Sequence, residues 1–326
     1  MYAVRVHEGG ALRYEQVPDP VPGPDEVLVE LRAASVNRRD LLVRYPPGPA
    51  YAFPLPLIPG SDGAGVRRDT GEEVVIYPAL GWGEREDAAG PDYALLGGPA
   101  DGTYAELIAV PQENLFPKPN RLSFQEAAAL PVAGLTAYRA LFTVGRLQAG
   151  ETVLVLGAGS GVSTFAVMLA REAGARVLVT SSSTDKIERA REIGADGGTL
   201  YTEGGWAAEI KELTGGRGVD LVLDSVGTTW PDSLRCLRRG GRAVVFGGTG
   251  GPSVEMDVRF LYLNWLSLLG TTLGSPREFA AFLGAVERAS WRPVIERVFP
   301  LAEAEAAHEQ LKGSHFGKLV LDISGA

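Results

Sequence analysis

The most constraining feature of the sequence is a strand, a glycine-rich turn, a helix and a second strand in direct succession. Residues 152–156 (TVLVL) are apolar and partly β-branched, which is typical of a buried parallel strand. A turn containing Gly157, Gly159 and Gly161 follows at once, and residues 162–173 then carry apolar side chains at helical spacing. Residues 176–180 predict the next strand. This order predicts the βαβ unit with which a doubly wound parallel sheet begins.

The glycine-rich turn also suggests a ligand. Glycines let the backbone approach a pyrophosphate closely, and the free N–H groups at a helix start favour its negative charge. The full G-x-G-x-x-G pattern is not present, and many strand-to-helix turns are glycine-rich without binding a nucleotide. With the whole βαβ unit around the turn, however, we expect dinucleotide binding.

The remaining patterns predict an α/β chain with two parts. Before about residue 130 the sequence alternates like β-strands and is rich in proline and glycine, which indicates a mainly β domain. From residue 151 onward, strands alternate with helices, as in a doubly wound sheet. Ser123, with Glu126 three residues later, predicts a helix start by a capping box.

Composition excludes several classes of protein. The net charge of −9 gives no support to a nucleic-acid partner, and the single cysteine, Cys236, rules out an intramolecular disulfide or a thiolate-rich zinc site. No apolar run approaches membrane-spanning length, and the N-terminus lacks a signal-peptide pattern. We therefore expect a cytoplasmic protein with neither a membrane nor a nucleic-acid partner.

Several short motifs together carry a family resemblance over nearly the whole length. Besides the glycine turn, they are residues 34–40 (ASVNRRD), 59–65 (PGSDGAG), 102–106 (GTYAE), 130–138 (LPVAGLTAY), 224–227 (DSVG) and 316–320 (FGKLV). In this order and spacing, the chain resembles a zinc-free member of the medium-chain dehydrogenase/reductase superfamily, in its quinone oxidoreductase (zeta-crystallin-like) branch. The resemblance implies a GroES-like, mainly β catalytic domain of residues 1–133 and 271–326, a Rossmann dinucleotide-binding domain of residues 134–270, and an active-site cleft between them.

The resemblance also shows what this chain lacks. Zinc-dependent relatives bind their catalytic metal with a cysteine and a histidine in segments that here hold Asn37 and Ser61, and neutral amide and hydroxyl groups do not make a zinc site. Residues 78–102 match the lobe that holds a second zinc in such relatives, but contain no cysteine. We therefore expect no zinc or other metal. His7, His308 and His315 are scattered, so we expect structural or surface roles for them.

Without a Lewis acid, reducing a conjugated carbonyl is less demanding than oxidising an alcohol. Hydride goes to the β-carbon, and hydrogen bonds stabilise the charge that reaches the oxygen. The resemblance thus implies NADPH-dependent reduction of a quinone or an α,β-unsaturated carbonyl. Asn37 is our first candidate for the oxygen-polarising donor, although a helix-capping role also fits it. Tyr45 and Tyr51 are candidates for substrate stacking or proton supply, although both could simply pack their proline-rich loop.

The cofactor preference follows from the second strand of the βαβ unit. NAD enzymes typically end this strand with an acid that binds the ribose 2′-hydroxyl, but Ser181 stands there. Ser182 and Lys186 could bind a 2′-phosphate, and by the resemblance Lys186 and Tyr201 match residues of that site, so NADP(H) is favoured over NAD(H). A solvated helix residue is the alternative for Lys186. By the same resemblance, other residues would line the cofactor path: Thr136, Gly159, Ser160, Gly161, Val162, Val226, Gly247 and Gly270.

Two other functions are compatible with the sequence. One function is a metal-independent alcohol dehydrogenase using NAD(P), and the other is a non-catalytic, crystallin-like or RNA-binding role, which the acidic charge disfavours.

Residues 253–269 are more apolar than a surface strand needs, so we expect a homodimer in which this segment extends the Rossmann sheet. A buried helix followed by an interior strand would explain the same pattern.

Overall fold

The computed structural model describes residues 1–325, which divide into two compact units. Over the described residues, unit 1 contains residues 1–133 and 275–325, and unit 2 contains residues 134–274. The chain thus passes from unit 2 back to unit 1 after Gly274, four residues beyond the boundary at residue 270 that was placed from the sequence. Within residues 1–325, no helix is long and apolar enough to cross a membrane.

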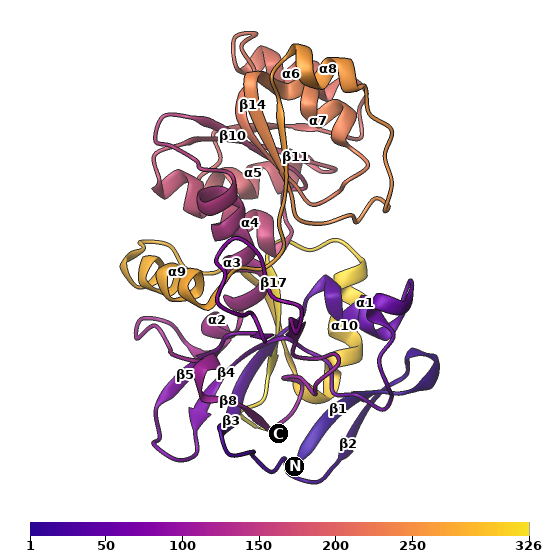
Figure 1. Ribbon diagram of the computed structural model, residues 1–326, viewed down its shortest axis with the longest axis vertical. Helices are drawn as coiled ribbons and strands as arrows, with labels where there is room; N and C mark the ends of the chain where they lie inside the picture. Colours follow the sequence, from indigo (N-terminus) through magenta and orange to yellow (C-terminus); the bar gives the residue numbers. More distant parts are fainter. Residues whose placement is uncertain (326) are drawn as a thin grey trace. The chain divides into compact units, whose positions relative to one another are not determined.

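Unit 1 is built mainly from β-strands (Figure 1). Its strands are β1 (Tyr2–Val6), β2 (Leu12–Gln16), β3 (Glu26–Ser35), β4 (Asp62–Arg67), β5 (Glu73–Ile76), β6 (Ala79–Leu80), β7 (Ala94–Leu95), β8 (Leu107–Pro111), β9 (Leu115–Pro117), β16 (Ile295–Pro300) and β17 (Lys318–Asp322). Its helices are α1 (Arg38–Arg44), α2 (Phe124–Ala128), α9 (Pro276–Arg288) and α10 (Ala304–Lys312). The main sheet has the order β16-β17-β3-β4-β5-β9, with β8 also paired to β3. The last strand of the chain is therefore an interior strand of the first unit.

Unit 2 is a six-stranded parallel sheet with helices between the strands (Figure 1). Its strands are β10 (Thr152–Val155), β11 (Arg176–Ser181), β12 (Gly197–Leu200), β13 (Val219–Asp224), β14 (Leu237–Val245) and β15 (Ser267–Gly270). Its helices are α4 (Gly161–Glu172), α5 (Thr184–Glu192), α6 (Trp206–Leu213), α7 (Trp230–Cys236) and α8 (Val258–Leu263). In the order β12-β11-β10-β13-β14-β15, successive strands of the chain are added on one side of β10 and then, from β13 onward, on its other side. Ligands of such sheets bind at this switch point, between β10 and β13.

Hydrophobic burial explains why the predicted strands form. Val153 and Leu154 of β10 and Leu178 of β11 are fully buried, as expected for strands covered on both faces. In unit 1, Phe279 of α9 packs edge-on against Phe116, with ring centroids 5.0 Å apart, and near Tyr77 at 5.6 Å. The capping box at Ser123 and Glu126 is present at the start of α2.

Two elements differ from the sequence-based expectation, and a third excludes one of the interpretations left open by the sequence. A proline within a helical pattern predicts an interruption at Pro131, but Pro131 instead begins a helix, α3 (Pro131–Tyr138). Proline fits there because it lacks only an N–H that the first helical turn leaves unbonded. The sequence predicts a strand over residues 104–110, whereas β8 begins at Leu107, since residues 104–106 bond instead to β1 and to β3. The apolar segment 253–269 forms neither a buried helix nor an interior strand: no residue of α8 is buried, and β15 lies at the sheet edge.

Candidate functional site

Strand pairing in unit 1 brings three polar residues from distant parts of the chain together. The end of β3 pairs with both neighbours, so that Ser35 lies opposite Asp62 of β4 and opposite Val320 of β17. Asn37 follows β3 directly, and Lys318 begins β17. The sheet register therefore places Asn37, Asp62 and Lys318 at one end of three adjacent strands.

The side chains of Asn37, Asp62 and Lys318 form a buried hydrogen-bonded cluster, the Asn37 cluster. The Lys318 ammonium donates to Asn37 Oδ1 at 2.7 Å, to Asp62 Oδ2 at 3.0 Å and to the carbonyl of Val36 at 3.2 Å. Asn37 Nδ2 donates to Asp62 Oδ2 at 2.8 Å, as does the Ser35 hydroxyl. The side-chain exposures of Lys318 and Asp62 are 3% and 0%, so this ion pair is shielded from water. Buried charges persist when paired and hydrogen-bonded in this way.

A second carboxylate, Asp40, supports Asn37 from the first turn of α1. Asp40 Oδ2 accepts the backbone N–H of Asn37 at 2.8 Å and the Tyr104 hydroxyl at 3.0 Å, while Oδ1 has no partner among residues 1–325. Burial raises the pKa of Asp40 to about 6. The Tyr104 hydroxyl also lies 3.3 Å from Nε2 of His308, a fully buried residue, and burial with the nearby Arg44 lowers the pKa of His308 to about 3.

The residues at the family's zinc positions do not fit a metal. The Ser61 hydroxyl donates to the carbonyl of Leu96 at 2.7 Å, and both polar ends of the Asn37 amide are engaged with Lys318 and Asp62. Over residues 1–325, no three His, Cys, Asp or Glu side chains are grouped so that they could hold a metal ion. Neutral oxygen donors without thiolate or imidazole partners are poor zinc ligands.

The two candidate tyrosines lie in different surroundings. Tyr45 follows α1 and is 45% exposed, and its ring contacts Gly10 and the cations of Arg44 and Lys312, which lie 4.9 and 5.1 Å from its centroid. These contacts favour a packing role for Tyr45. Tyr51 ends a short 3₁₀ turn (Pro49–Tyr51) and is half-buried. Neither tyrosine has a hydrogen bond to the Asn37 cluster within the described chain.

In unit 2, the turn after β10 presents free backbone donors. Ser160 caps α4, and its hydroxyl oxygen accepts the N–H of Ser163 at 3.1 Å. The N–H of Gly159 donates to the Ser163 hydroxyl, whereas those of Gly161 and Val162 donate to nothing within residues 1–325. Gly157 has φ +69° with open space at its Cβ position. Two unbonded N–H groups at the start of a 12-residue helix fit a pyrophosphate.

The predicted ribose-phosphate residues lie at the ends of β11 and β12. Ser181 is buried, Ser182 is exposed, and Lys186 on α5 is half-buried. Tyr201, 47% exposed, donates its backbone N–H to the carbonyl of Ser181 at 3.0 Å, which holds the two strand ends together. Ser181 rather than a carboxylate ends β11, so the strand end itself offers no acid to bind a 2′-hydroxyl or to repel a 2′-phosphate.

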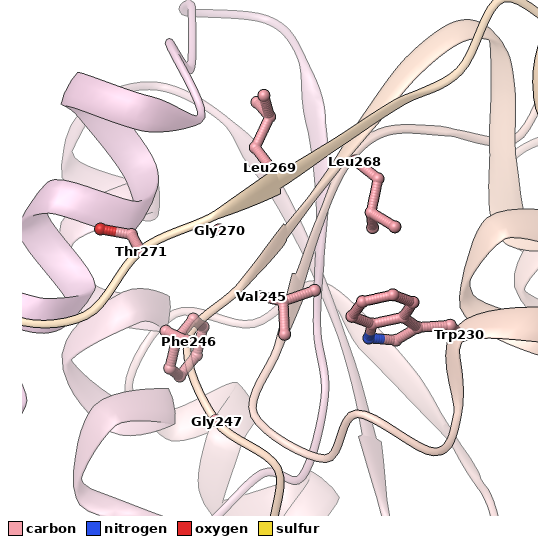
Figure 2. Close-up of a pocket in the computed structure, with 8 residues that line it drawn as sticks. All are labelled: Trp230, Val245, Phe246, Gly247, Leu268, Leu269, Gly270 and Thr271. Carbon is pink, nitrogen blue, oxygen red and sulfur yellow. The ribbon is translucent and has the colours of Figure 1, made fainter. Parts of the chain in front are cut away.

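The remaining predicted cofactor residues lie at the carboxyl ends of β13 to β15 or on α3. Asp224 is buried and shapes the loop after β13 by accepting the N–H groups of Val226 and Gly227. Gly247 and Gly270 line one pocket of about 450 Å³ together with Trp230, whose indole lies beside Val245 and Leu268 (Figure 2). Thr136 is buried on α3.

Sequence reasoning missed two residues of these sites. The buried indole N–H of Trp230 has no partner within the described chain. Trp230 lines the pocket shown in Figure 2, but no motif in the sequence indicates that it does so. Lys318 stands in the FGKLV motif, but only the pairing of β17 with β3 shows that its ammonium reaches Asn37.

Two family models match the chain. Residues 23–120 match the alcohol dehydrogenase GroES-like domain, and residues 161–288 match the zinc-binding dehydrogenase domain. A zinc-type alcohol dehydrogenase-like protein of Schizosaccharomyces pombe is 35% identical over 92% of this chain and 91% of its own length. The quinone oxidoreductase of Pseudomonas aeruginosa is 34% identical over 92% and 91%, and that of Rattus norvegicus 32% over 98% and 97%.

Solved structures share the whole fold. A structure described as an NAD-dependent alcohol dehydrogenase is 38% identical, with a TM-score of 0.93 over 99% of both chains. The 2-octenoyl-CoA carboxylase reductase CinF, solved with NADP and 2-octenoyl-CoA, is 26% identical, with a TM-score of 0.90 over 100% of this chain and 88% of its own. The expected GroES-like and Rossmann architecture is confirmed. The chain belongs to the medium-chain dehydrogenase/reductase superfamily, in its quinone oxidoreductase branch, and is an NAD(P)H-dependent oxidoreductase of small-molecule substrates.

Proposed function

We propose that this protein is a zinc-independent, NADPH-dependent reductase of quinones or α,β-unsaturated carbonyl compounds. The observation that carries the proposal is the Asn37 cluster. An amide held by a buried ammonium and a buried carboxylate stands in the segment where zinc-dependent relatives have a metal ligand. Such a site offers a hydrogen-bond donor instead of a Lewis acid.

Asn37 has one donor left for a substrate oxygen. One Nδ2 hydrogen is committed to Asp62 at 2.8 Å, whereas the other meets only the carbonyl of Ser35 at 3.5 Å, beyond the usual hydrogen-bond range. When bound, reduced nicotinamide would supply the hydride that the β-carbon of the conjugated substrate accepts. The Nδ2–H of Asn37 stabilises the negative charge that reaches the carbonyl oxygen of the substrate. Tyr51 is our remaining candidate for stacking or proton supply, because the contacts of Tyr45 favour a packing role.

The cofactor preference rests on the corner between β11 and α5. Ser181 replaces the usual acid, and Ser182 and Lys186 supply a hydroxyl and a cation for the 2′-phosphate. The unbonded N–H groups of Gly161 and Val162 would hold the pyrophosphate, and the pocket lined by Gly247, Gly270 and Trp230 would hold the nicotinamide end.

We also propose a homodimer formed through the edge of unit 2. Strand β15 has no neighbour on its outer side within the described chain, and the adjacent residues Tyr262, Leu263 and Trp265 are 59%, 58% and 65% exposed. An unpaired edge beside a cluster of large exposed apolar side chains favours a second copy across a two-fold axis.

A metal-independent alcohol dehydrogenase is the second candidate. The 38% identity to a structure described as an NAD-dependent alcohol dehydrogenase favours it. Such an enzyme would oxidise primary and secondary alcohols with NAD⁺ or NADP⁺, which a reductase that relies on Asn37 should not do at a comparable rate.

One assay separates the two candidates. Purified protein, treated with a chelator and checked for residual zinc, is incubated with NADPH or NADH and with menadione, cyclohexenone or cyclohexanone. The proposal predicts oxidation of NADPH by menadione or cyclohexenone, unchanged by chelation, and little activity with cyclohexanone. Activity that needs added zinc, or that is confined to cyclohexanone and its alcohol, would contradict it.

A further inference from the structure

Lys318 has a more specific relation to Asn37 than that of a neighbouring charge. An ammonium group can only donate hydrogen bonds, so the amide atom 2.7 Å from Lys318 Nζ must be the oxygen. An ionised carboxylate can only accept, so the amide atom 2.8 Å from Asp62 Oδ2 must be the nitrogen. The two charges therefore fix the orientation of the amide, which is otherwise ambiguous by shape.

The reverse orientation of Asn37 is strongly unfavourable. It would place the amide NH₂ against the Lys318 ammonium and the amide oxygen against the Asp62 carboxylate, in a site with 3% and 0% exposure of the two charged side chains. Asp62 is itself held in place, because its Oδ1 accepts the N–H of Val132 at 2.8 Å and its Oδ2 accepts the Ser35 hydroxyl. The amide thus has one orientation in a rigid frame.

The ammonium also changes the strength of the amide as a donor. Hydrogen bonds in a chain polarise one another, and a cation on the carbonyl oxygen withdraws electron density from the amide nitrogen. The Nδ2 hydrogen not bonded to Asp62 is the one that this polarisation strengthens for a substrate.

We propose that Lys318 is a positioning residue of the active site, which orients the Asn37 amide and strengthens its N–H as a donor to the substrate oxygen. This inference rests on the proposed role of Asn37. Lys318 Nζ uses all three of its donors, on Val36, Asn37 and Asp62. Strand β17 would thus help to stabilise the negative charge on the substrate.

The chain provides a matched control for removing a buried lysine. Lys118 is also in unit 1, is 5% exposed, and pairs with Glu73 at 3.1 Å while donating to the carbonyl of Leu122 at 2.6 Å. It has no hydrogen bond to the Asn37 cluster. Lys118→Met and Lys318→Met therefore remove the same kind of group, but only the second removes a partner of Asn37.

The test is a double-variant cycle on the rate of hydride transfer. Single-turnover oxidation of NADPH by cyclohexenone is measured in the wild type, Asn37→Ala, Lys318→Met, the double variant and Lys118→Met. NADPH affinity is measured in parallel by tryptophan fluorescence. We expect Lys318→Met to lower the rate by about tenfold or more with NADPH affinity unchanged, Lys118→Met to keep the wild-type rate, and the double variant to equal Asn37→Ala.

The outcomes distinguish the two proposals. An unchanged rate in Asn37→Ala would refute the proposed role of Asn37, and the inference with it. A reduced rate in Asn37→Ala, combined with a wild-type rate in Lys318→Met or with fully additive losses in the double variant, would refute only the role of Lys318.

A second variant covers the case in which Lys318→Met fails to fold. Lys318→Met combined with Asp62→Asn removes both charges, leaves no unpaired buried ion, and keeps an oxygen at position 62 for the amide of Asn37. We expect this protein to fold and still to transfer hydride at least about tenfold more slowly than the wild type. Recovery of the wild-type rate would show that Lys318 has only a structural role.

Discussion

Replacing Asp40 by asparagine should make the stability of the protein less dependent on pH. Asp40 is fully buried, its Oδ1 has no partner within the described chain, and its pKa rises from 3.8 to about 6. At about 1.4 kcal/mol per pKa unit, this rise corresponds to about 3 kcal/mol. An acid with a raised folded-state pKa stabilises the fold most below its unfolded-state pKa, and that stabilisation is lost as the pH rises to the folded-state pKa.

The wild type, but not Asp40→Asn, should lose stability as the pH rises through the folded-state pKa of Asp40. The free energy of unfolding of Asp40→Asn minus that of the wild type should increase by about 3 kcal/mol between about pH 4 and pH 6, and should be constant above about pH 7. Urea unfolding followed by tryptophan fluorescence at a series of pH values measures this difference. Asp69→Asn is the control, because Arg67 already lowers the pKa of the exposed Asp69 below this range. A difference for Asp40→Asn that does not change with pH would refute the reasoning.

Three further predictions address the cofactor, the core and the assembly. Lys186→Ala should weaken NADPH binding by about tenfold or more and leave NADH binding unchanged, and Ser181→Asp should make the protein prefer NADH. Fluorescence titration measures both affinities, and equal effects of a substitution on the two cofactors would count against this site. Phe279→Ala, which removes a fully buried ring, should destabilise unit 1 by about 3–5 kcal/mol in urea, and a loss below about 1 kcal/mol would show that the core repacks. Trp265→Glu should convert a dimer into monomers in analytical ultracentrifugation, and a wild-type protein already monomeric at micromolar concentration would remove the dimer proposal.

The sequence was most informative where one local pattern decides the structure. The βαβ unit and the capping box at Ser123 follow from spacing and from residue types whose hydrogen bonding is local, and the structure confirms them. Asn37 could be singled out because the family motif places it in a segment where zinc-dependent relatives have a metal ligand. The role of Asn37 itself stays a prediction.

The sequence was least informative where contacts depend on pairing between distant strands. Lys318 and Asn37 are 281 residues apart, and nothing local to either indicates the 2.7 Å hydrogen bond between them. Similarly, the apolar segment that includes Trp265 predicts burial equally well against its own chain or against a second copy. Only the strand order shows that β15 lies at the edge of the sheet and has one neighbouring strand within the described chain.

The most direct test of the proposed function follows the hydride itself. Chelator-treated protein of measured zinc content is incubated with cyclohexenone and NADPH carrying deuterium at the transferred position, and the products are analysed by mass spectrometry and NMR. We expect cyclohexanone with deuterium on the former β-carbon, formed at the same rate with and without chelator. Deuterium on the carbinol carbon of cyclohexenol would instead indicate an alcohol dehydrogenase, and the absence of labelled product, or its formation only after zinc is added, would contradict a metal-independent conjugate reductase.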